Sequence, residues 1–163
     1  ALLRESQHKA AAMIPSSGCI STTDLIYPRE INDIHGSKKE EIGERLAFMA
    51  AAKTYGLTGV PCDYPRYKSV ELQGKRAVIH LDNVVNGLTP NAELEGFEVA
   101  GEDRVFHPAK AKELWYCHAI EVTSDDVDDI KAVRYCFKNF SIGGIHNHVG
   151  LPLVPFRTDN WNE

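Results

Sequence analysis

Two patterns of apolar and polar residues divide the chain. In the first third the pattern favours helices: residues 2–12 are rich in good helix formers, and Ile42, Leu46, Met49 and Ala50 recur with the 3.6-residue period of a helix. After about residue 60 this period disappears, and Pro and Gly residues separate short β-prone runs. The pattern therefore predicts a first part with two helices and a second part built of strands.

The second helix carries the clearest local signals. Ser37 and Glu40 have the spacing of a capping box, and Gly56 is a suitable residue to end the helix. Because helical periodicity usually means burial, we expect the apolar stripe over residues 42–50 to pack on one face of a sheet.

A strand is predicted between the two helices. Residues 19–25 are rich in β-branched side chains and include Asp24 near their end. Ligand sites of α/β folds lie at the carboxyl ends of strands. Such a strand would bring the loop that follows it to the edge of a sheet.

The second part reads as an all-β region. A hairpin is expected around Gln73-Gly74, and the other runs are bounded by frequent turns, which is typical of a β-sandwich. The strand candidates are residues 70–72, 76–81, 94–99, 105–106, 115–122 and 132–137.

Composition limits the possible partners. The 163 residues are 43% hydrophobic and 25% charged with a net charge of −5, as in an ordinary globular protein, and no cluster of five or more Lys and Arg residues occurs. Nucleic acid is therefore not expected as a partner, and neither is a membrane, because no apolar run approaches the roughly 18 residues of a span. Residues 1–7 resemble a helix already under way, which indicates a piece of a longer protein.

No metal site is predicted. The four cysteines show no Cys-x-x-Cys spacing, and they allow three pairings or free thiols, so their redox state stays open. Cys117 and Cys136 fall in strand-like runs, where we expect small buried side chains. His146 and His148 share a face of an extended segment, but no carboxylate or cysteine stands at ligand spacing beside them.

One short motif suggests chemistry. Asp33 stands two residues before His35, and in an extended segment such residues project to the same side. Asp33 would then orient the imidazole while the other ring nitrogen faces a substrate, which is the base and orienter half of a hydrolytic triad. By itself the spacing is common, and a solvated loop is the simpler interpretation.

The surroundings of this motif resemble the last sequence block of the sialate O-acetylesterase-like carbohydrate esterases, which belong to the SGNH hydrolases. The matching residues are His35, Lys39, Gly43, Arg45, Leu46 and Ala47. Gly36 replaces the usual proline, which loosens the loop. Other SGNH enzymes carry the aspartate three residues before the histidine, where this chain has Asn32. We favour Asp33, because asparagine cannot neutralise an imidazolium.

Further blocks resemble the same family in the same order. They are the Arg4-Glu5-x-Gln7 run, residues 96–101, Phe106 with Pro108-Ala109, residues 132–135, and the closing run over residues 150–161. The resemblance thus extends over nearly the whole chain.

The resemblance implies an α/β fold: residues 1–60 would be the C-terminal segment of an SGNH-type, flavodoxin-like domain, and residues 61–163 a small β-sandwich domain. It implies a serine-type acetylesterase acting on an acetylated sugar such as sialic acid, without cofactor or metal. The chain has no Gly-x-Ser-like block before Asp33. It would supply His35 and Asp33, and an N-terminal part of the same enzyme would supply the serine and the oxyanion hole. The family also suggests a secreted or periplasmic location.

A different class of function remains open. The β-rich part is also compatible with a non-catalytic carbohydrate-binding or accessory module. Trp115, Tyr116 and Trp161 would then stack on sugars, although we expect buried core positions for these strand aromatics.

Overall fold

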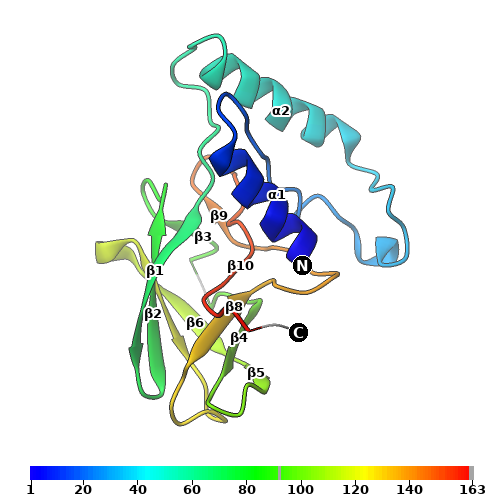
Figure 1. Cartoon of the computed structure of the whole chain (residues 1–163). Helices are drawn as coiled ribbons and strands as arrows, with labels where there is room; N and C mark the ends of the chain where they lie inside the picture. Colours follow the sequence, from blue (N-terminus) through cyan, green and yellow to red (C-terminus); the bar gives the residue numbers. More distant parts are fainter. Residues whose placement is uncertain (92, 162–163) are drawn as a thin grey trace.

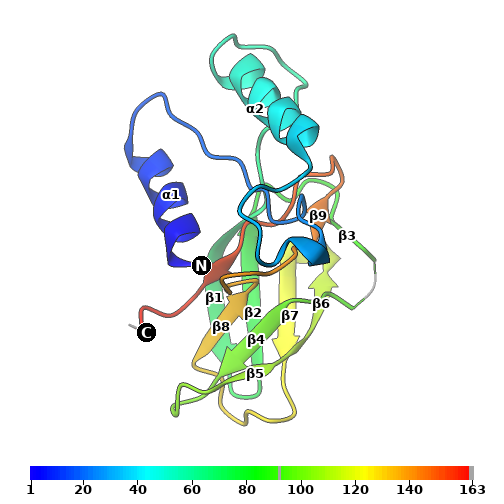
Figure 2. The same ribbon diagram turned by 90° about the vertical axis from the view of Figure 1, so that its right-hand side faces the viewer.

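The computed structural model describes residues 1–91 and 93–161, so residues 92, 162 and 163 of the predicted second part lie outside the described residues. It has a mixed α/β fold in which the helices precede the strands. Helix α1 spans Leu2–Met13, a 3-10 turn η1 spans Pro28–Glu30, and α2 spans Lys39–Lys53. Figures 1 and 2 show α1, α2 and their connecting segments together at one end of the strands.

Two four-stranded antiparallel sheets form the rest of the molecule. The first has the order β1-β2-β7-β6 and the second the order β10-β8-β4-β5. The strands of the first sheet are β1 (Arg66–Gln73), β2 (Arg76–Asp82), β6 (Lys110–Leu114) and β7 (Ala119–Thr123). The strands of the second are β4 (Phe97–Ala100), β5 (Phe106–Pro108), β8 (Ala132–Tyr135) and β10 (Phe156–Arg157). The short strands β3 (Leu88–Thr89) and β9 (His146–Asn147) pair with each other.

The two sheets share one hydrophobic core. Ile79 and Val122 of the first sheet and Val99 and Val133 of the second are completely buried in the same cluster. Aromatic rings extend this core, with Phe97 and Tyr135 at a centroid distance of 5.0 Å. Burial of this much apolar surface is the main source of stability that the chain has of its own.

The β1–β2 hairpin is confirmed. Gln73 pairs with Arg76, so the turn is Gly74-Lys75, and Gly74 has φ +65°. A side chain with a Cβ is strained at this φ, and a two-residue hairpin turn needs it, which explains the glycine.

The strand predicted over residues 19–25 is wrong. This segment forms turns and irregular chain, and no strand among the described residues pairs with it. Its backbone is joined to the β-rich part by a hydrogen bond from the Gly143 N–H to the Thr23 carbonyl, at 3.1 Å. Branched residues give a segment the preference for an extended shape, but a strand exists only where a neighbouring strand completes its hydrogen bonds.

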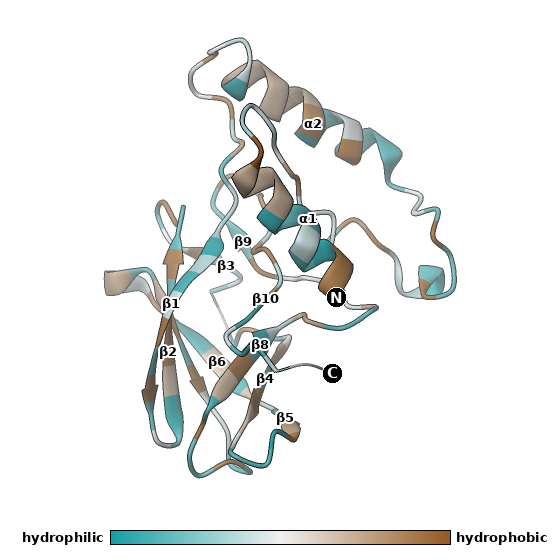
Figure 3. Cartoon of the chain, in the orientation of Figure 1, coloured by the Kyte–Doolittle hydropathy of each residue, from teal (hydrophilic) through white to brown (hydrophobic). Residues whose placement is uncertain are grey.

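Helix α2 also differs from the expectation. It begins one residue after Lys38, and the Ser37 hydroxyl donates to Glu30 instead of capping the helix. None of its residues is buried, and Leu46 and Phe48 are 52% and 42% exposed. The apolar stripe is therefore only partly covered within this chain. Met49 packs against the small buried cluster of Tyr64, Leu151 and Val154, but no sheet of the described residues covers Leu46; Figure 3 shows apolar patches along α2.

The strand expected over residues 115–122 begins later than predicted. Trp115–Cys117 form a 3-10 turn, and β7 starts at Ala119 after His118, whose φ of +52° lies in the left-handed region. This conformation reverses the chain between β6 and β7, so the aromatic residues lie at a hairpin tip. Neither α1 nor α2 has the length and apolar character needed to cross a membrane, and the described residues contain no other α-helix.

Candidate functional site

The loop between η1 and α2 carries Asp33 and His35, and Glu30 holds the loop closed. The Glu30 side chain accepts hydrogen bonds from the backbone N–H of Tyr27 at 2.8 Å and of Ser37 at 2.9 Å, and also from the Ser37 hydroxyl. Glu30 thereby joins the start of η1 to the segment that leads into α2. The loop between these points has a fixed base.

Glu30 is ionised in this arrangement. The hydrogen bond from the Ser37 hydroxyl, followed by the one from the Tyr27 backbone, lowers the pKa of Glu30. Sequence reasoning missed this residue. The signal was the Tyr27-x-x-Glu30 spacing with Pro28 after Tyr27, which is the pattern of a helix start with Pro at the first helical position.

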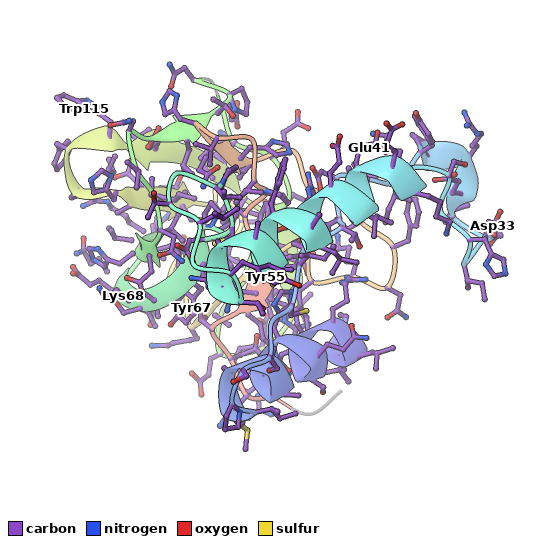
Figure 4. The ribbon with its side chains drawn as sticks, turned by 90° about the horizontal axis from the view of Figure 1, so that it is seen from above. Asp33, Glu41, Tyr55, Tyr67, Lys68 and Trp115 are labelled. Carbon is purple, nitrogen blue, oxygen red and sulfur yellow. The ribbon has the colours of Figure 1, made fainter. Side chains whose placement is uncertain are left out.

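Asp33 contacts the main chain of His35. The His35 backbone N–H donates to Oδ1 of Asp33 at 2.8 Å, which is a local aspartate turn. Among the described residues no hydrogen bond joins the Asp33 carboxylate to the His35 ring, so the role of Asp33 as orienter stays a prediction. Both residues are exposed, and Ile34 between them is 92% exposed. Figure 4 shows Asp33 projecting at one edge of the molecule.

A shallow pocket lies beside this loop. Residues 30–34 line it together with Leu25, Ile42 and Phe140. The lining is mixed, because Thr22, Lys39 and Asn139 border the pocket beside these apolar side chains. Ile31 and Ile34 are the exposed apolar side chains of this lining, and exposed apolar side chains beside a polar loop indicate a surface that makes contacts.

A second polar cluster connects α2 to the β-rich part through Asp24. Arg45 on α2 forms two hydrogen bonds with the Asp24 carboxylate, at 2.7 and 2.5 Å, and a third with the Ser21 carbonyl at 2.8 Å. From the other side His146 places Nε2 3.1 Å from Oδ2 of Asp24. The side chains of Arg45 and Asp24 are only 11% and 10% exposed, so the pair is largely shielded from water.

The surroundings of Asp24 shift its pKa. Burial alone would raise the pKa of Asp24, but the hydrogen bonds from Arg45 and then from His146 outweigh it and lower the pKa to about 2. Asp24 is therefore charged whenever the protein is folded at ordinary pH. The carboxylate fixes α2 against residues 21–24.

We expect Asp24→Asn to destabilise the protein by about 2 kcal/mol at neutral pH. The pKa of Asp24 falls from 3.8 in the unfolded chain to about 2 in the folded one, so its contribution is complete above about pH 4 and is lost as pH falls toward 2. Denaturant unfolding at several pH values checks this. Asp63→Asn, in an exposed pair with Lys53, is the matched control and should cost less than about 1 kcal/mol. A difference between wild type and Asp24→Asn that persists undiminished to pH 2 would contradict the assignment.

The histidines and cysteines considered as metal ligands contact other groups of the protein. His146 lies against Asp24, and the described residues contain no group of three or more His, Cys, Asp or Glu side chains arranged to hold an ion. All four cysteines are free thiols. Cys136 is buried as expected, whereas Cys117 is exposed at the β6–β7 tip, so the expectation of a buried Cys117 is wrong.

The expected burial of the aromatics is also wrong for two of the three. Trp115 and Tyr116 are 76% and 69% exposed, because the 3-10 turn lifts them off the sheet. Trp161 is partly buried, and its ring lies 5.9 Å from that of Phe106.

The blocks noted in the sequence meet in space near the chain ends. Arg134 on β8 forms a bidentate ion pair with Asp159, with N–O distances of 2.9 and 3.0 Å. Arg157 on β10 forms a second such pair with Glu5 on α1, at 3.1 and 3.0 Å. The second pair ties the first helix to the second sheet.

Comparison with solved structures gives an informative likeness. No protein-family model matches the chain, and no curated protein matches it. Among solved structures, the chain is similar to the crystal structure of a novel carbohydrate acetylesterase from Xanthomonas citri, with 36% sequence identity and a TM-score of 0.87. The chain has the fold of a part of that enzyme. The likeness covers 98% of this chain and 36% of the enzyme, so the chain spans little more than a third of its length.

Proposed function

We propose that the chain is the C-terminal part of a serine-type carbohydrate O-acetylesterase of the SGNH superfamily. The observation that carries the proposal is the likeness to a carbohydrate acetylesterase over 98% of the chain at 36% identity. Residues 1–60 would be the end of the SGNH domain, and residues 61–163 a β-sandwich domain. The shared core of the two sheets supports the second assignment.

His35 and Asp33 are the proposed catalytic residues of this chain. His35 takes the proton from a serine hydroxyl of the N-terminal part, and then gives a proton to the leaving sugar hydroxyl. Asp33 fixes the tautomer of His35 and stabilises the imidazolium. The exposed ring of His35, on a loop whose base is held by Glu30, supports this role, because a partner group can reach it.

The proposed N-terminal part has a surface on which to pack. Ile34 at the loop tip and Leu46 and Phe48 on α2 are exposed, and so is Ile31 in the pocket beside the loop. Covering these side chains removes apolar surface from water, which favours association by roughly 25 cal/mol per Å². The same packing would exclude water from His35 and bring the serine to it.

The substrate class is an acetylated sugar, with O-acetylated sialic acid as the specific candidate. Neither step of the proposed reaction uses a metal or cofactor. The protein in which this chain follows an N-terminal SGNH part is called the joined enzyme below. Acetate release from O-acetylated sialic acid by the joined enzyme tests whether sialic acid is the substrate. Activity on other acetylated sugars only would overturn the choice of sialic acid but not the esterase function.

We expect the isolated chain to show almost no turnover of p-nitrophenyl acetate, while the joined enzyme is active. A His–Asp pair without a serine has no acyl-enzyme route, and loss of even one oxyanion donor costs roughly 100- to 1000-fold. Spectrophotometric release of p-nitrophenol from both proteins makes the comparison. Substantial hydrolysis by the isolated chain that His35→Ala abolishes would show that the chain contains its own nucleophile.

A non-catalytic accessory module is the second candidate, and the exposure of Trp115 and Tyr116 favours it. In that case the chain would bind sugar, and the joined enzyme would keep its esterase activity after His35→Ala. The same variant therefore separates the two functions.

A further inference from the structure

The β6–β7 tip presents two aromatic rings to solvent at right angles. Trp115 and Tyr116 have centroids 6.2 Å apart and an interplanar angle of 84°. One ring forms a floor and the other a wall, so that together they make an open corner. Monomeric proteins rarely expose large aromatic side chains side by side unless these side chains bind something.

The corner has a defined position. Leu114 pairs with Ala119 at the end of the β6–β7 ladder, and the His118 carbonyl accepts a hydrogen bond from the backbone N–H of Leu81 at 3.3 Å. The Cys117 thiol lies 3.5 Å from the Leu114 carbonyl. These contacts hold the turn on both sides, so the rings are carried by a fixed hairpin end.

Two shallow hollows meet at Trp115, and Asn86 lines both of them. One hollow is also bordered by Tyr116 and His118, and the other by Glu113 and His148. The lining thus combines two flat aromatic rings with two amides, two imidazoles, a carboxylate and an ammonium group.

Glu113 is fixed within this surface. Its Oε1 accepts a hydrogen bond from the Leu88 backbone N–H at 2.9 Å, beside Gly87. A Cβ at Gly87 would lie 3.2 Å from the same oxygen, and Gly87 has φ +90°. The glycine therefore lets loop 83–88 approach Glu113 closely, and the loop keeps Asn86 next to the aromatic tip.

The chemistry of this surface fits a neutral sugar. The C–H face of a pyranose ring packs on the negative face of an aromatic ring, and its hydroxyls both donate and accept hydrogen bonds. The lining offers donors and acceptors side by side. Its formal charges, Lys112 and Glu113, cancel, so nothing in the lining favours an anionic ligand.

We propose that Trp115 and Tyr116, with Asn86 beside them, form a binding site for a neutral pyranose oligosaccharide at a distance from His35. Figure 4 shows Trp115 and Asp33 at opposite edges of the molecule, so this is a site separate from the proposed catalytic loop. The choice of a sugar draws on the proposed function, but binding at the tip does not require that His35 take part in catalysis.

The test is a titration of the full chain with cellohexaose, xylohexaose and mannohexaose, followed by NMR of the two tryptophan indole N–H signals. We expect millimolar binding of at least one oligosaccharide, with a shift of the Trp115 signal and none of the Trp161 signal. Trp115→Ala should weaken binding at least about tenfold, because it removes the floor of the corner. Asn86→Gly, which keeps the φ of +62° accessible, should weaken it about threefold.

The matched control is Tyr55→Ala. Tyr55 is 77% exposed, like Trp115, but lies beyond the end of α2, and its loss should leave binding unchanged. Circular dichroism of each variant checks that the fold is kept. Absence of binding by all three oligosaccharides, binding that Trp115→Ala leaves unchanged, or tighter binding of N-acetylneuraminic acid overturns the proposal. The proposal is also overturned if the chain self-associates in sedimentation and Trp115→Ala abolishes that association, because a second copy of the chain would then bind the tip. If the unmutated joined enzyme has no esterase activity but the tip still binds sugar, the proposed function alone is overturned.

Discussion

His35→Ala is expected to lower kcat of the joined enzyme for an acetyl ester by about 10,000-fold or more. The serine would lose the base that takes its proton, and the leaving sugar would lose the acid that protonates it. Because His35 is exposed on a loop whose base is held by Glu30, the free energy of unfolding should stay nearly unchanged. Steady-state kinetics and denaturant unfolding of the same preparation measure both quantities. A fall in activity of less than about tenfold would show that His35 is not the catalytic base.

The structure also offers a sharp variant for Asp33. Asparagine at this position still accepts the hydrogen bond from the His35 backbone N–H, so Asp33→Asn keeps the turn and removes only the charge. If the carboxylate orients the imidazole and stabilises the imidazolium as proposed, kcat of Asp33→Asn should be about 1,000- to 10,000-fold lower than that of the wild type. An unchanged kcat would assign Asp33 to the turn alone.

The largest effect on stability is expected for Arg134→Met. The side chains of Arg134 and Asp159 are 7% and 1% exposed, and the hydrogen bonds from Arg134 hold the pKa of Asp159 down against the burial that would raise it. Removing the guanidinium leaves a buried carboxylate without its bidentate partner. Such a loss costs about 3–5 kcal/mol in the free energy of unfolding. Urea unfolding at pH 7 provides the measurement.

Lys68→Met is the matched control for that variant. Lys68 also forms an ion pair, with Asp82, but the two side chains are 61% and 52% exposed. Water and salt screen such a pair, so its loss should cost less than about 1 kcal/mol. Equal effects of the two substitutions would mean that the Arg134–Asp159 pair contributes no more than a surface contact.

Local signals in the sequence were enough for the elements that the chain completes by itself. Residues 2–12 were predicted as a helix from composition and form α1, and the run around Gln73-Gly74 forms the β1–β2 hairpin. Both depend on neighbours within a few residues. Arg134 and Asp159 belong to two of the blocks that resemble the family, but the sequence alone did not show that these blocks meet in space.

The incorrect predictions share a physical cause, which is that their outcome depends on long-range partners. Residues 19–25 have strand propensity without a neighbouring strand, and Leu46 is apolar at a core-like spacing without a sheet to cover it. For the site, the sequence placed Asp33 and His35 in one loop. The Tyr27-x-x-Glu30 spacing indicated only a helix start, not the contact of Glu30 with Ser37 across the loop. That Asp24 joins Arg45 to His146 had no signal either, because both contacts depend on residues distant in the sequence.

The most direct test of the central claim is covalent labelling of the joined enzyme with a fluorophosphonate, followed by peptide mass spectrometry. The reagent reacts with a serine only where a base activates it. The account predicts one adduct on a serine outside residues 1–163, whose rate of formation falls at least about 100-fold in His35→Ala. An adduct on a serine of this chain, or labelling of His35→Ala at the wild-type rate, would contradict the claim that the chain supplies the catalytic histidine and another part supplies the serine.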